Sequence, residues 1–215
     1  MTAPLGAIVL AGGRATRLDG VDKPSLELGG VSLLTRAVNA AREAGAASVV
    51  VVGPPGSDIE RTIRVREDPP FAGPAAAIIT GLGATDPGVD PEWMLVLAAD
   101  LSHPDAAVAR LVADLPLLPG DTDGVCLADE TSRPQWLTGV YRTAALRRAA
   151  DGVPDGGRNA PVRALLDDLS IAVFRVPDEV VHDVDTWQDL EQARRSYGDA
   201  APRPRSPTGP EEDTP

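Results

Sequence analysis

Short apolar runs alternate along the chain with segments in which apolar residues recur every three or four positions. Continuous apolar runs are typical of strands buried on both faces of a parallel sheet. They predict strands at residues 7–10, 48–52, 62–67, 93–99, 125–128, 136–141 and 171–176. The periodic segments predict helices at 32–44, 74–84, 104–115, 143–150, 160–169 and 187–197. This alternation predicts an α/β fold: a three-layer, Rossmann-like, open and mostly parallel sheet with helices on both faces.

Local signals place the ends of several of these helices. Ser32 is a candidate N-cap of the first helix, Gly45 lies just past its end, and Pro104 suits the first turn of a later helix. For the last helix, Asp185 and Thr186 both suit the N-cap position, and the sequence leaves that choice open.

The domain organisation follows from where this patterning stops. The chain has 215 residues, which suits one domain with a single core. Residues 1–198 form the predicted domain, and residues 199–215 are rich in proline and acidic residues without apolar periodicity, so we expect a disordered tail. The lone Cys126 excludes an internal disulfide framework, and its apolar surroundings predict a small core residue.

Composition excludes two classes of partner. A net charge of −12 argues against a general binder of nucleic acid or of an anionic membrane. No apolar run approaches the roughly 20 residues that span a bilayer, and the N-terminus lacks the pattern of a secretory signal. We therefore expect a cytoplasmic protein.

The richest candidate chemistry follows the first predicted strand. Leu10 to Lys23 forms a loop with adjacent glycines, Gly12 and Gly13, and with the cations Arg14, Arg17 and Lys23. Glycines let backbone N–H groups approach an anion closely, and cations balance its charge. The loop therefore predicts a phosphate site. Arg17 and Lys23 are the stronger candidates, whereas the role of Arg14 stays open.

Carboxylates follow other strands of the predicted sheet. Asp68 follows the short third strand, and Asp100 lies at the end of the strand predicted at 93–99. Asp183 and Asp185 precede the last helix. Strand ends of an open α/β sheet meet at one edge, where ligands bind. Asp100, with Asp185 as the favoured second ligand, predicts a Mg²⁺ site shared with substrate phosphate. Asp185 could instead serve only as the cap of the last helix, a position that Thr186 also suits.

Other residues carry weaker signals. A loop histidine, His103, more often has a structural role than an acid–base one. Arg133, Gln135 and Trp136 could line an acceptor pocket, although an aromatic residue in a strand is more often part of the core. Two further cations either hold an acceptor phosphate or are simply solvated, namely Arg158 and Arg163.

Several of these segments together resemble the molybdenum cofactor guanylyltransferases, within the MobA-like nucleotidyltransferases. The resemblance covers about residues 5–195 and rests on Leu10 to Arg17 with Asp22-Lys23, Asp68 followed by Gly73-Pro74, Asp100, and Asp183-Val184-Asp185-Thr186. The chain departs from the family pattern in four places. Ala77 replaces a glycine, only Asp100 survives of Cys-Asp-x-Pro, and Asp183 and Asp185 replace asparagines. The stretch Arg133 to Arg142 follows the family's acceptor-side pattern only loosely.

The resemblance implies a fold of the nucleotide-diphospho-sugar transferase type and transfer of GMP from GTP to the molybdopterin cofactor. The catalytic residues it implies are Arg17, Lys23 and Asp100. The nucleotide-binding residues it implies are Leu10, Ala11, Gly12, Gly13, Arg17, Lys23, Asp68 and Asp100. Mg²⁺ is the implied cofactor, on Asp100 and Asp185, and molybdoenzymes or other cofactor-synthesis proteins are implied partners.

Two alternative functions stay open on the sequence alone. The first is a nucleotidyltransferase with another base or acceptor, such as a cytidylyltransferase. The second is a non-catalytic nucleotide-binding homologue that acts as an interaction partner, which the departures at Ala77 and around Asp100 favour. A dinucleotide-dependent oxidoreductase is disfavoured, because the loop lacks Gly-x-Gly-x-x-Gly.

Overall fold

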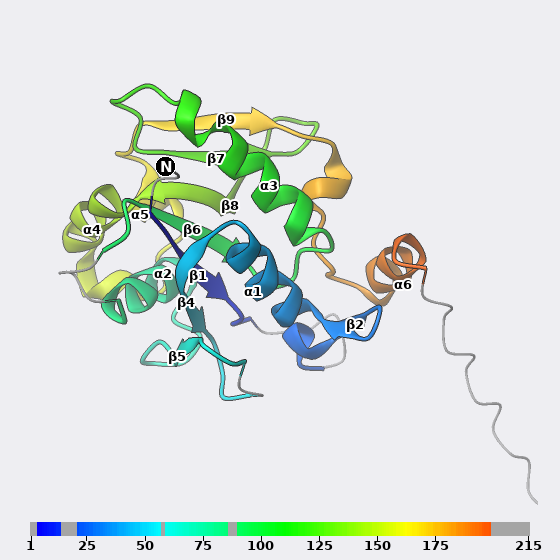
Figure 1. Ribbon diagram of the computed structural model, residues 1–215. Coiled ribbons are helices and arrows are strands. Elements are labelled where there is room, and N and C mark those ends of the chain that lie inside the picture. The colour runs from blue at the N-terminus through cyan, green and yellow to red at the C-terminus, as the bar shows by residue number, and fades with distance from the viewer. Residues whose placement is uncertain (1–3, 14–20, 57–58, 86–89, 199–215) are drawn as a thin grey trace, which may run out of the picture.

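A seven-stranded sheet forms the centre of the molecule, with the strand order β5-β4-β1-β6-β8-β7-β9 (Figure 1). The structure is a computed structural model and describes residues 4–13, 21–56, 59–85 and 90–198. The strands of this sheet are β1 (Leu5–Leu10), β4 (Ala46–Val52), β5 (Ile63–Val65), β6 (Trp93–Ala98), β7 (Gly124–Ala128), β8 (Pro134–Arg142) and β9 (Ile171–Arg175). Strand β8 runs antiparallel to both neighbours, and the other pairs are parallel.

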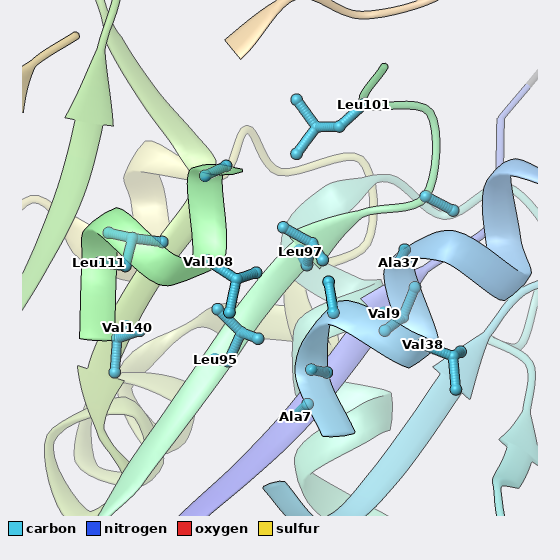
Figure 2. Close-up of a cluster of buried hydrophobic side chains, with 14 of the residues drawn as sticks. Ala7, Val9, Ala37, Val38, Leu95, Leu97, Leu101, Val108, Leu111 and Val140 are labelled. Carbon is cyan, nitrogen blue, oxygen red and sulfur yellow. The ribbon is translucent and has the colours of Figure 1, made fainter. Parts of the chain in front are cut away.

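Helices cover both faces of this sheet and make three layers. They are α1 (Leu33–Glu43), α2 (Pro74–Gly83), α3 (Pro104–Asp114), α4 (Thr143–Gly152), α5 (Arg163–Leu166) and α6 (Trp187–Ser196). Alternate residues of β1 separate the two cores: Val9 packs on the side of α1 and α3, whereas Ile8 packs on the side of α2, α4 and α5. Figure 2 shows the first core, where Val38 of α1 and Val108 of α3 lie over β1 and β6. The predicted α/β architecture is confirmed.

A third, smaller core attaches the last helix to the domain. Leu28 and Leu33 pack against Val184 and Leu190, so that α6 lies against the hairpin of β2 (Glu27–Leu28) and β3 (Val31–Ser32). This packing brings a segment from the end of the chain next to the loop that follows β1.

The sequence predicted most element boundaries and missed two features. Ser32 caps α1 as expected, because its side chain accepts a hydrogen bond from Thr35 N. The predicted helix 160–169 was wrong in length: the helix is only Arg163–Leu166, and Pro161, which has no backbone N–H to donate, lies before it. The β2–β3 hairpin was missed because each strand has only two residues.

Two expectations concern the ends of the domain and membranes. The predicted tail, residues 199–215, lies outside the described residues, so the domain boundary stays a prediction. Within the described residues, none of the helices has the length and apolar character needed to cross a bilayer.

Candidate active site

A pocket of about 530 Å³ opens at the carboxyl ends of β1 and β6. Its lining comes from the end of β1, the loop between β5 and α2, the end of β6, the strand β8 and the segment before α6. The loops after β1, β5 and β6 therefore meet at one edge of the sheet, as the strand order predicts.

The glycines after β1 form one wall of this pocket. Leu10, Gly12 and Gly13 line it, while Ala11 is buried beside them and donates its N–H to Val52 O at 2.7 Å. A Cβ on Gly12 would meet only Glu67 Oε1, at 3.6 Å, and one on Gly13 would meet nothing within 4 Å. The backbone here borders open space that a ligand can approach closely. Arg14 and Arg17 lie outside the described residues.

Lys23 connects the loop after β1 to two carboxylates from distant parts of the chain. Its Nζ donates to Asp100 Oδ2 at 2.5 Å and to Asp185 Oδ1 at 2.7 Å. Burial alone would lower the pKa of Lys23, but the charge of Asp100 and the hydrogen bonds to both carboxylates raise it above its usual value. Lys23 therefore stays a cation, with only 14% of its side chain exposed.

Backbone pairing fixes these carboxylates relative to each other. Leu101 and Asp183 form an isolated antiparallel bridge, and Val184 N donates to Asp100 O at 2.9 Å. The segment after β6 and the segment before α6 are thus held side by side. Burial and the negative charge of Asp100 raise the pKa of Asp183 to about 7, because this corner concentrates carboxylates.

Thr186, rather than Asp185, caps α6. The Thr186 side chain accepts from Asp189 N, and the Asp189 carboxylate accepts from Thr186 N, which completes a capping box. The carboxylate of Asp185 points instead to Lys23. The choice that the sequence left open is therefore resolved in favour of Thr186.

This cap leads to a prediction about stability. Thr186→Ala removes the cap acceptor, so the free energy of unfolding should fall by about 1 kcal/mol. Thr186→Ser keeps the hydroxyl and is the matched control. Urea denaturation monitored by circular dichroism measures both variants. Equal losses in the two variants would show that the methyl group, and not the cap, is responsible.

Two adjacent carboxylates, Glu67 and Asp68, precede α2 and differ in their exposure and in their contact with the pocket. Glu67 is 7% exposed and lines the pocket, whereas Asp68 is exposed and is not part of the lining. Within the described part of the chain, no hydrogen bond or ion pair reaches the Glu67 carboxylate. Asp68 stays a prediction as a nucleotide contact, and Glu67, which the sequence did not single out, is the carboxylate of the two that lines the pocket. The signal for Glu67 was its place next to Asp68, since neighbouring residues of an extended segment point to opposite sides.

The carboxylates suit a hard divalent cation. Oxygens of Asp100 and Asp185 both lie within 2.7 Å of one point, the Lys23 ammonium, so they converge on a position for positive charge. Over the described ranges, the structure holds no group of three or more His, Cys, Asp or Glu side chains arranged to bind a metal. Two carboxylates with substrate phosphate and water are what Mg²⁺ commonly uses, and the residues present fit that ion.

The remaining candidate residues lie in the core, on the surface or in the lining of the pocket. His103 stacks on Tyr197 with ring centroids 5.2 Å apart, which favours its structural role. Cys126 is fully buried, and burial raises the pKa of its thiol to about 12, as expected for a core residue. Arg158 is exposed, and Arg163 pairs with Asp167 at 3.2 Å on the surface. Ala77 lines the pocket, so the departure from glycine falls within the site.

Comparison with known proteins relates the chain to a family of enzymes. The family model described as MobA-like NTP transferase domain matches residues 7–171. A protein of Opitutus terrae named a probable molybdenum cofactor guanylyltransferase is 30% identical over 206 residues, which cover 90% of this chain and 96% of that protein.

Solved structures share the fold at lower identity. The molybdopterin-guanine dinucleotide biosynthesis protein A of Archaeoglobus fulgidus superposes with a TM-score of 0.60 at 18% identity, covering 90% of this chain and 98% of that chain. Rv0371C of Mycobacterium tuberculosis, in complex with manganese, superposes with a TM-score of 0.64 at 19% identity, covering 90% of this chain and 99% of that chain. At these identities the structures support the fold alone.

Proposed function

The chain belongs to the MobA-like NTP transferase family, and on this premise we propose that it transfers GMP from GTP to the phosphate of the molybdopterin cofactor. The contact of Lys23 with Asp100 and Asp185 beside the glycine-lined pocket is the observation that carries this proposal. The name of the Opitutus terrae relative supports guanine as the base and the molybdenum cofactor as the acceptor. Because the reaction consumes GTP, we place it in the cytoplasm, and molybdoenzymes are proposed recipients of the product.

The reaction needs positioning and charge neutralisation more than it needs a base. An oxygen of the acceptor phosphate forms a bond to the α-phosphorus of GTP, and the bond from that phosphorus to the β-phosphate oxygen breaks to release pyrophosphate. The attacking oxygen is already anionic, so no side chain has to remove a proton. Catalysis then depends on alignment and on stabilising the transferred charge.

The chain supplies this stabilisation from three directions. Backbone N–H groups at Gly12 and Gly13 border the place proposed for the phosphates. Asp100 and Asp185 would hold Mg²⁺, which would neutralise triphosphate charge, and the manganese in the Rv0371C structure supports a divalent cation. Arg17, by resemblance, and Lys23 would bind the triphosphate itself.

Two groups of anions can bind the Lys23 ammonium: the carboxylates of Asp100 and Asp185, and the phosphates of a bound nucleotide. In the structure its ammonium lies between the carboxylates of Asp100 and Asp185. A triphosphate on Gly12 and Gly13 offers further anionic oxygens on the same side of the pocket. We propose that Lys23 moves from the carboxylates to the phosphates when the nucleotide binds, so that the two carboxylates become available to a cation.

Glu67 provides a test of the nucleotide side. Among the described residues nothing pairs with the Glu67 carboxylate, which lies beside Gly12 and suits the N–H or O–H donors of a bound nucleotide; hydrogen bonds to a charged group contribute about 1.5–3 kcal/mol. We therefore expect Glu67→Gln to weaken GTP binding by about tenfold to a hundredfold. The neighbouring Asp68→Asn removes the same charge outside the pocket, so it should have the smaller effect. Isothermal titration calorimetry with GTP compares them, and a larger loss in Asp68→Asn would restore Asp68 as the binding residue.

A screen of nucleotides tests the proposed reaction as a whole. GTP, CTP and ATP are incubated with Mg²⁺, with and without molybdopterin cofactor, and released pyrophosphate is measured. Release with GTP that depends on the cofactor is expected. Release with CTP in its place would indicate a cytidylyltransferase. Binding of GTP without release, with every acceptor tried, would favour the non-catalytic homologue.

A further inference from the structure

Ser102 is a buried polar residue that joins the loop after β6 to the segment before α6. It lies two residues after Asp100 and is only 2% exposed. Its backbone N–H and its hydroxyl both donate to the carbonyl oxygen of His182, at 2.9 Å and 3.0 Å. Ser102 stands where the family pattern Cys-Asp-x-Pro has proline, which has neither an N–H nor a hydroxyl. Both bonds therefore depend on a residue in which this chain departs from the family pattern.

The backbone bond of Ser102 is half of the isolated bridge between these two segments. In one of its two bonds, Val184 N donates to Asp100 O at 2.9 Å. In the other, Ser102 N donates to His182 O. With the first bond alone, the segment before α6 would be free to turn about it, and Asp185 would move relative to Asp100. The second bond removes that rotation.

The carbonyl oxygen of Ser102 holds the far end of α6. It accepts from the hydroxyl of Tyr197, the C-cap residue of α6, at 2.9 Å. His182 lies before α6 and Tyr197 lies at its end, so Ser102 is bonded to residues on both sides of this helix. All the hydrogen-bonding groups of Ser102 therefore attach α6 to the loop that carries Asp100.

Asp189 extends this attachment from His182 to Asp185. His182 Nε2 lies 3.4 Å from Asp189 Oδ1, and Asp189 Oδ2 accepts from Asp185 N at 3.1 Å. Burial alone would raise the pKa of Asp189, but hydrogen bonds from Thr186 and from Asp185 N, with the nearby His182, lower it below its usual value. Asp189 is therefore a carboxylate that fixes the backbone of Asp185 next to the residue that Ser102 holds.

We infer that Ser102 is a positioning residue for the metal site, which keeps Asp185 at a fixed distance from Asp100 through its hydrogen bonds to His182 and Tyr197. This inference rests on the proposed function, in which the two aspartates hold the metal. Groups that orient metal ligands without touching the metal commonly contribute tenfold to a hundredfold to its affinity. The serine at this position is then a hydrogen-bonded replacement for the proline of the family pattern.

The test measures metal affinity without turnover. Electron paramagnetic resonance of unbound Mn²⁺, in the absence of nucleotide, gives the Kd of each variant. Ser102→Pro removes the N–H and the hydroxyl and should weaken Mn²⁺ binding by about tenfold. Ser102→Ala removes only the hydroxyl and should lose less. Thr62→Ala is the matched control, because its hydroxyl also donates to a carbonyl, that of Ile59 at 2.8 Å, outside the pocket lining, and it should leave Mn²⁺ binding unchanged.

A second readout separates positioning from general destabilisation. In the Ser102 variants, the Mg²⁺ concentration that gives half-maximal pyrophosphate release should rise, while saturating Mg²⁺ restores kcat and leaves the KM for GTP unchanged. A variant that is only less stable would lose kcat at every Mg²⁺ concentration. If circular dichroism shows that Ser102→Pro does not fold, Ser102→Ala combined with Tyr197→Phe removes two of the three bonds and should show the same effects.

The outcomes distinguish this inference from the proposed function. Weaker Mn²⁺ binding in the Ser102 variants of a protein that releases no pyrophosphate with any acceptor would overturn the reaction and keep the positioning role. Pyrophosphate release with molybdopterin, together with an unchanged Mn²⁺ affinity and Mg²⁺ requirement in these variants, would keep the reaction and overturn the positioning role. An equal loss of Mn²⁺ affinity in Thr62→Ala would also overturn it, because that loss would not depend on the segments that Ser102 joins.

Discussion

Asp100→Asn is expected to abolish the divalent-metal-dependent release of pyrophosphate while the fold remains intact. The substitution replaces one carboxylate oxygen with an amide that cannot neutralise a cation, and it also removes the partner that Lys23 bonds at 2.5 Å. Losing one electrostatic group at a reaction centre lowers kcat by about a hundredfold to a thousandfold. Pyrophosphate release with GTP and molybdopterin measures this loss.

The fold should tolerate the change because the structural contact of this residue is made by its backbone. Val184 N donates to the carbonyl oxygen of Asp100, and asparagine keeps that oxygen. Asp121→Asn is the matched control, since it removes an exposed carboxylate outside the pocket lining. Circular dichroism and thermal melting check the fold of both variants. Undiminished turnover in Asp100→Asn would remove this residue from the metal site.

The convergence of loops at this site could be predicted from the sequence because it depends on strand order. Parallel strands place their carboxyl ends at one edge, so the loops after β1, β5 and β6 had to meet there. The cap of α6 could not be decided in the same way: Asp189 lies three residues after Thr186 and Gln188 lies three residues after Asp185, so both candidates have the spacing of a capping box. The structure selects Thr186, whose side chain accepts from Asp189 N.

Other parts of the site depend on contacts between distant residues. Lys23 lies 77 residues from Asp100 and 162 residues from Asp185. The sequence therefore predicted a phosphate contact for Lys23 and a metal for the aspartates, but it did not predict the ion pairs between Lys23 and these two carboxylates. A bulge interrupts the ladder between β8 and β7, and it depends on how the two strands align and on the hydroxyl of the buried Tyr141. Local patterns of apolar residues predict that a strand exists, but they do not predict where its ladder is interrupted.

Lys23→Met is expected to weaken GTP binding and, in the absence of nucleotide, to strengthen the binding of Mn²⁺. Methionine keeps the length of the side chain and removes its charge. Truncating one partner of a buried charge pair costs about 2–5 kcal/mol, so GTP affinity should fall at least about thirtyfold if Lys23 binds the triphosphate. Calorimetry with GTP measures this effect, and Lys23→Arg, which keeps the charge, should lose less.

The gain in Mn²⁺ affinity follows from the contacts in the structure. The Lys23 ammonium is the cation now bonded to Asp100 and Asp185, so a metal ion entering without nucleotide has to displace it. Without that ammonium, the carboxylates repel one another, because the charges of Asp100 and Asp185 already act on Asp183. A divalent ion relieves the repulsion, and its affinity should rise by about tenfold, roughly 1.4 kcal/mol.

Electron paramagnetic resonance of unbound Mn²⁺ measures this affinity without any need for turnover. The same repulsion should lower the melting temperature of Lys23→Met, and added Mn²⁺ should restore it. In Lys23→Arg, Mn²⁺ should bind as weakly as in the unaltered protein, because a guanidinium still neutralises the carboxylates. If Mn²⁺ binds equally well with and without the Lys23 charge, the ammonium does not compete for the metal position, and the movement of Lys23 from carboxylates to phosphates is excluded.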